Sequence, residues 1–137
     1  DVTIQAQILE LIKELKESIN SSYMFISHDL SVLAEVSDRI AIMYAGQVVE
    51  VGKKENIFDQ PKHPYTQMLM EAIPTIEAHE LKGIKGEVPD MRNPPKGCMF
   101  RDRCPYAMPI CAEKRPDLIK VGEDHYVACF LYEGDKS

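Results

Sequence analysis

The sequence predicts an α/β fold followed by a small, irregular, cysteine-rich region, and three observations carry this prediction. In the first half of the chain, apolar residues at helical spacing alternate with short apolar runs typical of strands. Residues 75–97 are polar and rich in glycine and proline, which indicates a connection. The four cysteines all follow that connection, at Cys98, Cys104, Cys111 and Cys129.

The first predicted elements are a helix, a strand and a second helix. Residues 2–19 have apolar residues at helical spacing, which predicts an amphipathic helix with Asp1 as its N-cap. Residues 23–27 are apolar and partly aromatic and predict a buried strand. Asp29 is the expected N-cap of a helix over residues 30–36.

A hairpin and two short helices complete the first half. Residues 38–44 and 47–51 predict paired strands around an Ala-Gly turn. Short helices are expected over residues 53–58 and 65–73. Beyond the connection we expect an irregular module that needs an external staple, because it has too few large apolar residues to fold on burial alone.

Composition and charge narrow the class of protein. The net charge of -6 argues against a dedicated nucleic-acid binder, which usually carries a basic face. No apolar run approaches the roughly 20 residues of a membrane span, and the first residues lack the pattern of a signal peptide. We therefore expect a cytoplasmic chain that reaches a membrane only through partner subunits. Because it opens inside a predicted helix without an initiator Met, we expect it to be a piece of a longer protein.

His28 is the candidate catalytic residue, because it stands where the predicted strand 23–27 ends and the next helix begins. Ligands of open α/β sheets bind at the carboxyl ends of strands, and helix N-termini favour phosphate. A histidine there can donate to a γ-phosphate oxygen and orient an attacking water. Position alone favours the simpler alternative, a loop histidine that binds no ligand.

Residues 24–52 resemble the switch-histidine segment of ABC-type ATPases. That family has a strand, Ser/Thr-His-Asp, a helix, Asp-Arg-Ile, and a hairpin with one glycine and a closing glycine. The matching residues are Ser27-His28-Asp29, Asp38-Arg39-Ile40, Gly46 and Gly52. The resemblance implies that the α/β part is the C-terminal part of a P-loop (ABC-type) ATPase core, and that His28 contacts the γ-phosphate of ATP.

The start of the chain fits the same resemblance. It implies that Asp1 is the aspartate of the D-loop, which faces the phosphate loop of the opposite subunit; a plain helix cap is the alternative, and both roles are compatible. The sequence contains no Gly-x-x-x-x-Gly-Lys-Ser/Thr phosphate loop and no ABC signature. The magnesium-binding aspartate and catalytic glutamate of the family would lie upstream of Asp1. We expect this chain alone to be inactive and the intact subunit to use ATP and Mg²⁺.

Residues 60–74 resemble the arm of oligopeptide and dipeptide transporter ATPases. The match rests on His63-Pro64-Tyr65-Thr66, a Leu/Met helix, and Ala72-Ile73-Pro74. His63 and Tyr65 are expected to pin the arm to the core rather than to act in catalysis. The resemblance implies a fragment of the ATP-hydrolysing subunit that powers peptide import, bound peripherally at the cytoplasmic face of the cell membrane. The implied partners are a second, homologous ATPase subunit, transmembrane permease subunits and, indirectly, a peptide-binding protein, with no nucleic acid.

The cysteines follow a C-x5-C-x6-C-x17-C pattern. Zinc fingers and ferredoxins usually have tighter spacings, so the pattern alone points to neither metal. The tail resembles the C-terminal extension of the same peptide-transporter subunits, which implies a 4Fe-4S cluster held by Cys98, Cys104, Cys111 and Cys129. Zinc, and unliganded or oxidised thiols, are the alternatives.

The predicted organisation has three parts. Residues 1–60 are the end of the ATPase core, residues 61–83 are a linking arm with the His-Pro-Tyr motif, and residues 84–137 are the cysteine-rich extension. A competing hypothesis is a stand-alone, non-enzymatic metal-binding or regulatory module, which the missing phosphate loop favours for the chain as given. A phosphate loop and signature motif encoded upstream would decide between the two.

Overall fold

The computed structural model describes residues 2–74 and 83–134. Within them the chain divides into two compact units, Asp1–Asp38 and Arg39–Ser137. The three parts predicted from the family resemblance, residues 1–60, 61–83 and 84–137, have other boundaries than these units, which meet after residue 38. No helix in the described ranges is both long enough and apolar enough to cross a membrane.

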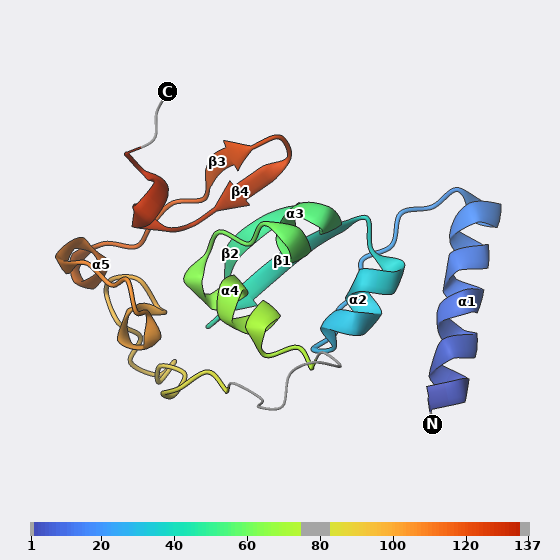
Figure 1. Cartoon of the computed structure of the whole chain (residues 1–137), viewed down its shortest axis with the longest axis horizontal. Coiled ribbons are helices and arrows are strands. Elements are labelled where there is room, and N and C mark those ends of the chain that lie inside the picture. Colours follow the sequence, from blue (N-terminus) through green and yellow to red (C-terminus); the bar gives the residue numbers. More distant parts are fainter. Residues whose placement is uncertain (1, 75–82, 135–137) are drawn as a thin grey trace. The chain divides into compact units, whose positions relative to one another are not determined.

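The first unit contains two helices, both as predicted (Figure 1). Helix α1 covers Val2–Ile19 and α2 covers Leu30–Val36. Asp29 is the N-cap of α2, because its carboxylate accepts hydrogen bonds from the backbone N–H groups of Ser31 and Val32. The sequence therefore predicts the start of α2 correctly.

Ion pairs join α1 to the segment that contains α2. Lys13 pairs with Glu35 at 2.9 Å, and Lys16 pairs with Asp38. All four side chains are substantially exposed, so each pair contributes little to stability. The predicted cap of α1 at Asp1 lies outside the described residues.

The buried strand predicted over residues 23–27 is wrong. The segment forms no regular element, and the side chains of Met24 and Ile26 are 92% and 90% exposed. A strand is stabilised by hydrogen bonds to a neighbouring strand, and none in the described part of the chain pairs with this segment. The apolar run is therefore uncovered, although its composition suits a sheet interior.

The second unit is built on a four-stranded antiparallel sheet with the order β1-β2-β4-β3. Strands β1 (Arg39–Tyr44) and β2 (Gln47–Lys53) form the predicted hairpin. Helices α3 (Lys54–Asp59) and α4 (Pro64–Glu71) lie within one residue or two of the predicted short helices.

The tail supplies the other two strands, which corrects the prediction of a wholly irregular module. Strands β3 (Ile119–Gly122) and β4 (His125–Val127) form a hairpin, and β4 pairs with β2 (Figure 1). The rest of the tail contains α5 (Pro109–Glu113) and two 3₁₀ turns, Arg101–Arg103 and Phe130–Tyr132. Strands of four and three residues are too short to leave a clear alternation in the sequence.

Glycine at position 52 permits this pairing. A Cβ atom on Gly52 would lie 2.6 Å from the carbonyl oxygen of Asp124, closer than real Cβ contacts allow. Beside it, the Arg39 guanidinium makes two hydrogen bonds to the Asp124 carboxylate, of 3.0 and 2.7 Å. The tail hairpin is thereby fixed to the start of β1.

The core of the second unit lies between the hairpin, the arm and the tail. Tyr44 of β1, Tyr65 of α4 and Phe100 of the tail form an aromatic cluster, with ring centroids 4.7 to 5.5 Å apart. The arm and the tail thus share one core with the hairpin. The fully buried side chains of this unit include Glu50 of β2, Ile57 of α3, His63 and Thr66 of the arm, and Val127 of β4.

Candidate functional site

His28 lies in the turn that leads into α2, as predicted, but the strand predicted before it does not form. Its side chain is exposed. Its neighbours have local roles: the Ser27 hydroxyl accepts a hydrogen bond from the Asp29 backbone N–H at 3.0 Å, and Asp29 caps the helix. The hydrogen bond from Ser31 holds the pKa of the Asp29 carboxyl below its ordinary value. The His28 side chain is therefore presented to solvent beside the Asp29 helix cap.

The predicted D-loop residue, Asp1, lies outside the described residues. Its role stays a prediction, as does the contact between His28 and a nucleotide.

The four cysteines come together in the structure. They lie in different segments of the tail: Cys98 and Cys104 flank the first 3₁₀ turn, Cys111 belongs to α5, and Cys129 follows β4. All four line one small cavity and none forms a disulfide. Their spacing in the sequence does not predict this convergence, which depends on the β3–β4 hairpin returning the chain to the same place.

A glycine lets two of the cysteine segments approach closely. The backbone N–H of Cys98 donates a 2.7 Å hydrogen bond to the carbonyl oxygen of Cys111. A Cβ atom on the preceding Gly97 would overlap that carbonyl oxygen. Any side chain at position 97 would force the two segments apart.

Burial affects the ionisation of three of the cysteines. Burial raises the pKa of the thiols of Cys98, Cys104 and Cys129, the last to about 11. Backbone N–H groups oppose this effect; the one from Leu131, for example, lowers the pKa of Cys129. Without a bound cation, these thiols are protonated at neutral pH, so a metal must displace their protons to bind.

Within residues 2–74 and 83–134, no group of three or more His, Cys, Asp or Glu side chains is arranged to hold a metal ion. The thiols share a cavity but are not set at ligand distances around one point. The geometry alone does not support a 4Fe-4S cluster, which stays a prediction.

Glu50 organises the interior of this unit, and the sequence patterns do not identify it. Its side chain is fully buried, and its carboxylate accepts hydrogen bonds from the backbone N–H groups of Lys62 and His63, each 2.8 Å long. Its Oε1 also lies 2.6 Å from His125 Nε2. A buried carboxylate with three partners joins β2, the arm and β4, and a single glutamate in a strand gives no sign of this in the sequence.

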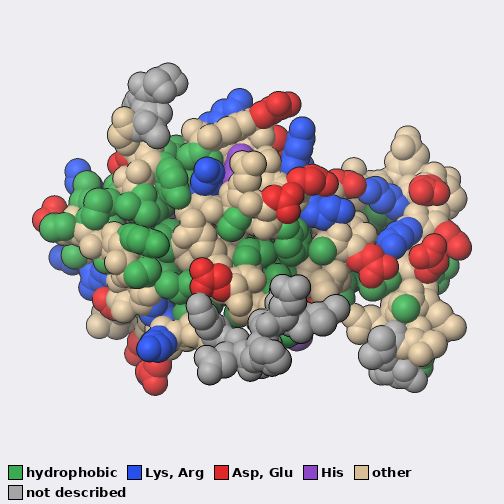
Figure 2. All heavy atoms as spheres, viewed as in Figure 1, with side chains coloured by type: hydrophobic (Ala, Val, Ile, Leu, Met, Phe, Trp, Pro, Cys, Tyr) green, Lys and Arg blue, Asp and Glu red, His purple; other side chains and the backbone are tan. Residues whose placement is uncertain are grey.

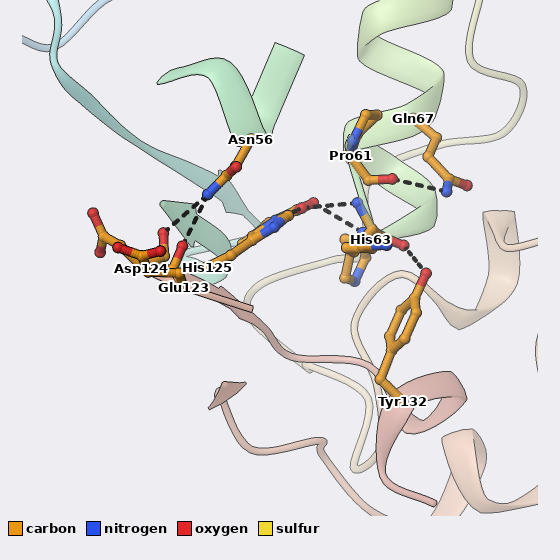
Figure 3. Close-up of polar contacts among 10 residues, drawn as sticks. Asn56, Pro61, His63, Gln67, Glu123, Asp124, His125 and Tyr132 are labelled. Carbon is orange, nitrogen blue, oxygen red and sulfur yellow. Dashed lines mark hydrogen bonds and ion pairs between the residues drawn. The ribbon is translucent and has the colours of Figure 1, made fainter. Parts of the chain in front are cut away.

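His63 pins the arm, as predicted. Its Nδ1 accepts a 3.0 Å hydrogen bond from the backbone N–H of Tyr65, which caps α4. The adjacent backbone is held by Tyr132, whose hydroxyl donates to the Lys62 carbonyl at 2.6 Å (Figure 3). Burial lowers the pKa of His63 to about 4. The imidazole is therefore neutral at physiological pH.

Hydrophobic side chains gather over the α5 end of this unit in Figure 2. Among the exposed hydrophobic side chains of the tail are Tyr106, Ile110 and Leu131, which are 55%, 36% and 42% exposed. The first and third of them line the cysteine cavity. Exposed hydrophobic side chains thus form part of the cavity wall.

Comparisons with known proteins agree with the sequence resemblance. Residues 49–111 match the family described as oligopeptide/dipeptide transporter, C-terminal region. The chain is 51% identical to the oligopeptide transport ATP-binding protein OppD of Bacillus subtilis, over 98% of this chain and 38% of that protein. It is 47% identical to the oligopeptide transport ATP-binding protein AppF of the same organism, over 96% of this chain and 42% of that protein.

A dipeptide transport ATP-binding protein is also similar. DppD of Bacillus subtilis is 45% identical over 97% of this chain and 40% of that protein. The chain thus spans about two fifths of the length of the curated relatives that it matches. The family model therefore matches residues 49–111, and the similarity to oligopeptide transport ATP-binding proteins extends over nearly the whole chain.

Proposed function

We propose that this chain is the C-terminal part of the ATP-hydrolysing subunit of a peptide-importing ABC transporter. The observation that carries the proposal is the 51% identity to an oligopeptide transport ATP-binding protein over 98% of the chain. A match of that extent includes both the switch-histidine segment and the cysteine-rich tail.

In the intact subunit, His28 contacts the γ-phosphate of ATP and Asp1 faces the phosphate loop of the opposite subunit. Two homologous ATPase subunits enclose two ATP molecules with Mg²⁺, and their closure drives import through transmembrane permease subunits that receive peptide from a binding protein. The assembly places this subunit at the cytoplasmic face of the membrane. The exposed position of His28, at the capped start of α2, supports this role.

The proposal is tested by reconstituting the full-length subunit with its partner ATPase and permease subunits in vesicles. ATP-dependent uptake of labelled oligopeptides or dipeptides is expected, and it should stop when ATP is replaced by a non-hydrolysable analogue. Uptake of sugars or free amino acids in place of peptides would contradict the proposal.

We further propose that the four cysteines hold a metal–sulfur centre, with 4Fe-4S as the expected group. The observation that favours this is their shared cavity, reached from four segments of the tail. Four thiolates are the donor set of iron–sulfur clusters and of structural zinc. When bound, the group supplies a cross-link among these segments and a site that one electron can reduce.

The test is elemental analysis of the full-length subunit purified without oxygen. Iron and acid-labile sulfide in near-equal amounts are expected, with loss of both after a single Cys98→Ser change. Stoichiometric zinc would assign the site to zinc, and four titratable thiols without metal would reduce the tail to an interaction module.

A further inference from the structure

A second cavity, of about 450 Å³, lies beside the small cavity of the cysteines and shares Phe100 as a lining residue with it. Its volume is within the usual range of small-ligand pockets, roughly 300–1,000 Å³. Its walls come from the start of β2, from residues 98–100 and from residues 115–118, which precede β3. The cavity therefore has room for a small ligand between segments that are far apart in the sequence.

One wall of this second cavity is the edge of a strand. Within the described ranges, β4 pairs with β2 at residues 50–52, and beyond them the Ala128 N–H donates to the Val49 carbonyl at 2.8 Å. The first residues of β2, Gln47 and Val48, pair with β1, but no described strand pairs with them on the side of β4. Peptide groups on such an edge readily pair with an added extended segment.

A cation and an anion lie close together in another wall. Arg115 and Asp117 both line the cavity, and both side chains are exposed. Among the described residues neither belongs to an ion pair, and the Arg115 guanidinium donates to the Pro95 carbonyl at 3.0 Å. Two residues of extended chain span about 6.6 Å, and a dipeptide carries its ammonium and its carboxylate at the two ends of a chain of that length. The two charges therefore match the two ends of a dipeptide.

Apolar side chains form most of the remaining wall. Val49, Met99 and Phe100 line the cavity and are buried. Val48 and Leu118 also line it, but they are 39% and 44% exposed. An apolar ligand side chain placed against these two residues would remove their surface from water, which is favourable.

We propose that this cavity binds a short peptide in an extended conformation, with its carboxylate at Arg115 and its ammonium at Asp117. The peptide group pairs with the free edge of β2, and the apolar side chains contact Val48 and Leu118. A simple anion would use Arg115 alone, and a free amino acid has no peptide group to pair with the strand. The site lies within this chain and does not depend on the proposed transport activity.

The test is calorimetric titration of the full-length subunit, purified without permease subunits and without nucleotide, with the dipeptide Leu-Leu. Two analogues each remove one charge: N-acetyl-Leu-Leu lacks the ammonium, and Leu-Leu amide lacks the carboxylate. Arg115→Gln should weaken the binding of Leu-Leu and of N-acetyl-Leu-Leu by about threefold to tenfold and leave that of Leu-Leu amide unchanged. Asp117→Asn should weaken the binding of Leu-Leu and of Leu-Leu amide and leave that of N-acetyl-Leu-Leu unchanged.

Glu113→Gln and Lys114→Gln are the matched controls, because both side chains are exposed and neither lines the cavity. Both are expected to bind Leu-Leu as the wild type does. If a cavity variant does not fold, as its thermal midpoint would show, weaker binding of both analogues than of Leu-Leu by the wild type still supports the site.

No saturable binding of Leu-Leu by the wild type overturns the peptide site, and so does equal affinity for N-acetyl-Leu-Leu amide, which lacks both charges. Charge-dependent binding that neither cavity substitution weakens would place the peptide elsewhere and also overturn it. Loss of ATP-dependent peptide uptake with Leu-Leu binding intact would count against the proposed function alone.

Discussion

Glu50 of β2 and His125 of β4 face each other inside the second unit, with 2.6 Å between Oε1 and Nε2. Both side chains are buried, and the same carboxylate holds two backbone N–H groups of the arm. The strands, the arm and the tail hairpin are therefore joined through one carboxyl group. Removing it leaves its partners buried without an acceptor.

Glu50→Ala is expected to destabilise the chain by about 3–5 kcal/mol, because it leaves buried hydrogen-bond donors of the arm and of β4 without an acceptor. The measurement is urea unfolding followed by circular dichroism. Glu87→Ala is the matched control, because that side chain is exposed in the connection, and a change within about 0.5 kcal/mol is expected there. Equal effects of the two substitutions would show that the Glu50 contacts contribute little.

The stability of the wild type should fall as pH decreases from 6.5 to 4. Burial depresses the pKa of His63 from 6.5 in the unfolded chain to about 4 in the folded one. As the pH falls, the unfolded chain therefore binds a proton at His63 before the folded chain does, which lowers the free energy of unfolding. The contribution of neutral, buried His63 to the free energy of unfolding is fully present above pH 6.5. It is lost between pH 6.5 and pH 4, by about 3 kcal/mol at most. Unfolding free energies at neutral pH and at two acidic pH values inside the window measure it. The slope should be smaller in His63→Asn, and identical slopes would contradict the assignment to His63.

Gly97→Ala is expected to open the cysteine cavity, because its Cβ would overlap the Cys111 carbonyl oxygen. Strain of this kind costs about 1–3 kcal/mol or more, and the thiols that line the cavity should react faster with a thiol reagent. Gly83→Ala is the control, since a Cβ atom there would meet nothing within 4 Å. Thiol reaction rates that match between the two variants would argue that the cavity does not need glycine at position 97.

His28→Ala in the full-length subunit is expected to lower the rate of ATP hydrolysis by about 10²–10³ while ATP binding is retained, because the lost contact acts mainly in the transition state. Steady-state kinetics and nucleotide titration measure the two properties separately. Glu35→Ala, an exposed change on the following helix, is the control. A rate for His28→Ala within about threefold of the wild type, less than about 1 kcal/mol, would rule out the switch role.

The chain of 137 residues should not bind Mg-ATP. Its sequence has no phosphate loop, so the backbone donors and lysine that surround the phosphates in P-loop proteins are missing from it. Calorimetric titration is the direct measurement, and the full-length subunit is the positive control. Micromolar binding by the chain alone would show that the nucleotide site lies elsewhere than proposed.

The sequence predicts well the elements that depend on nearby residues. Helix α2 begins after its Asp29 cap, and the β1–β2 hairpin forms around the Ala-Gly turn. The signals for both lie within a few positions of the elements themselves. The prediction for residues 23–27 is wrong, because their composition suits a strand whose partners are not among the described strands.

The cysteine pattern and the His-Pro-Tyr motif are evident from the sequence by itself, and so is the family resemblance that they carry. Only the tertiary structure decided that Glu50 joins three elements, that β4 pairs with β2, and that His63 lines the cavity of the four thiols. The physical reason is sequence distance: Glu50 and His125 are 75 residues apart. Such contacts form only when the tertiary fold brings distant segments together, and a local sequence pattern contains no information about that.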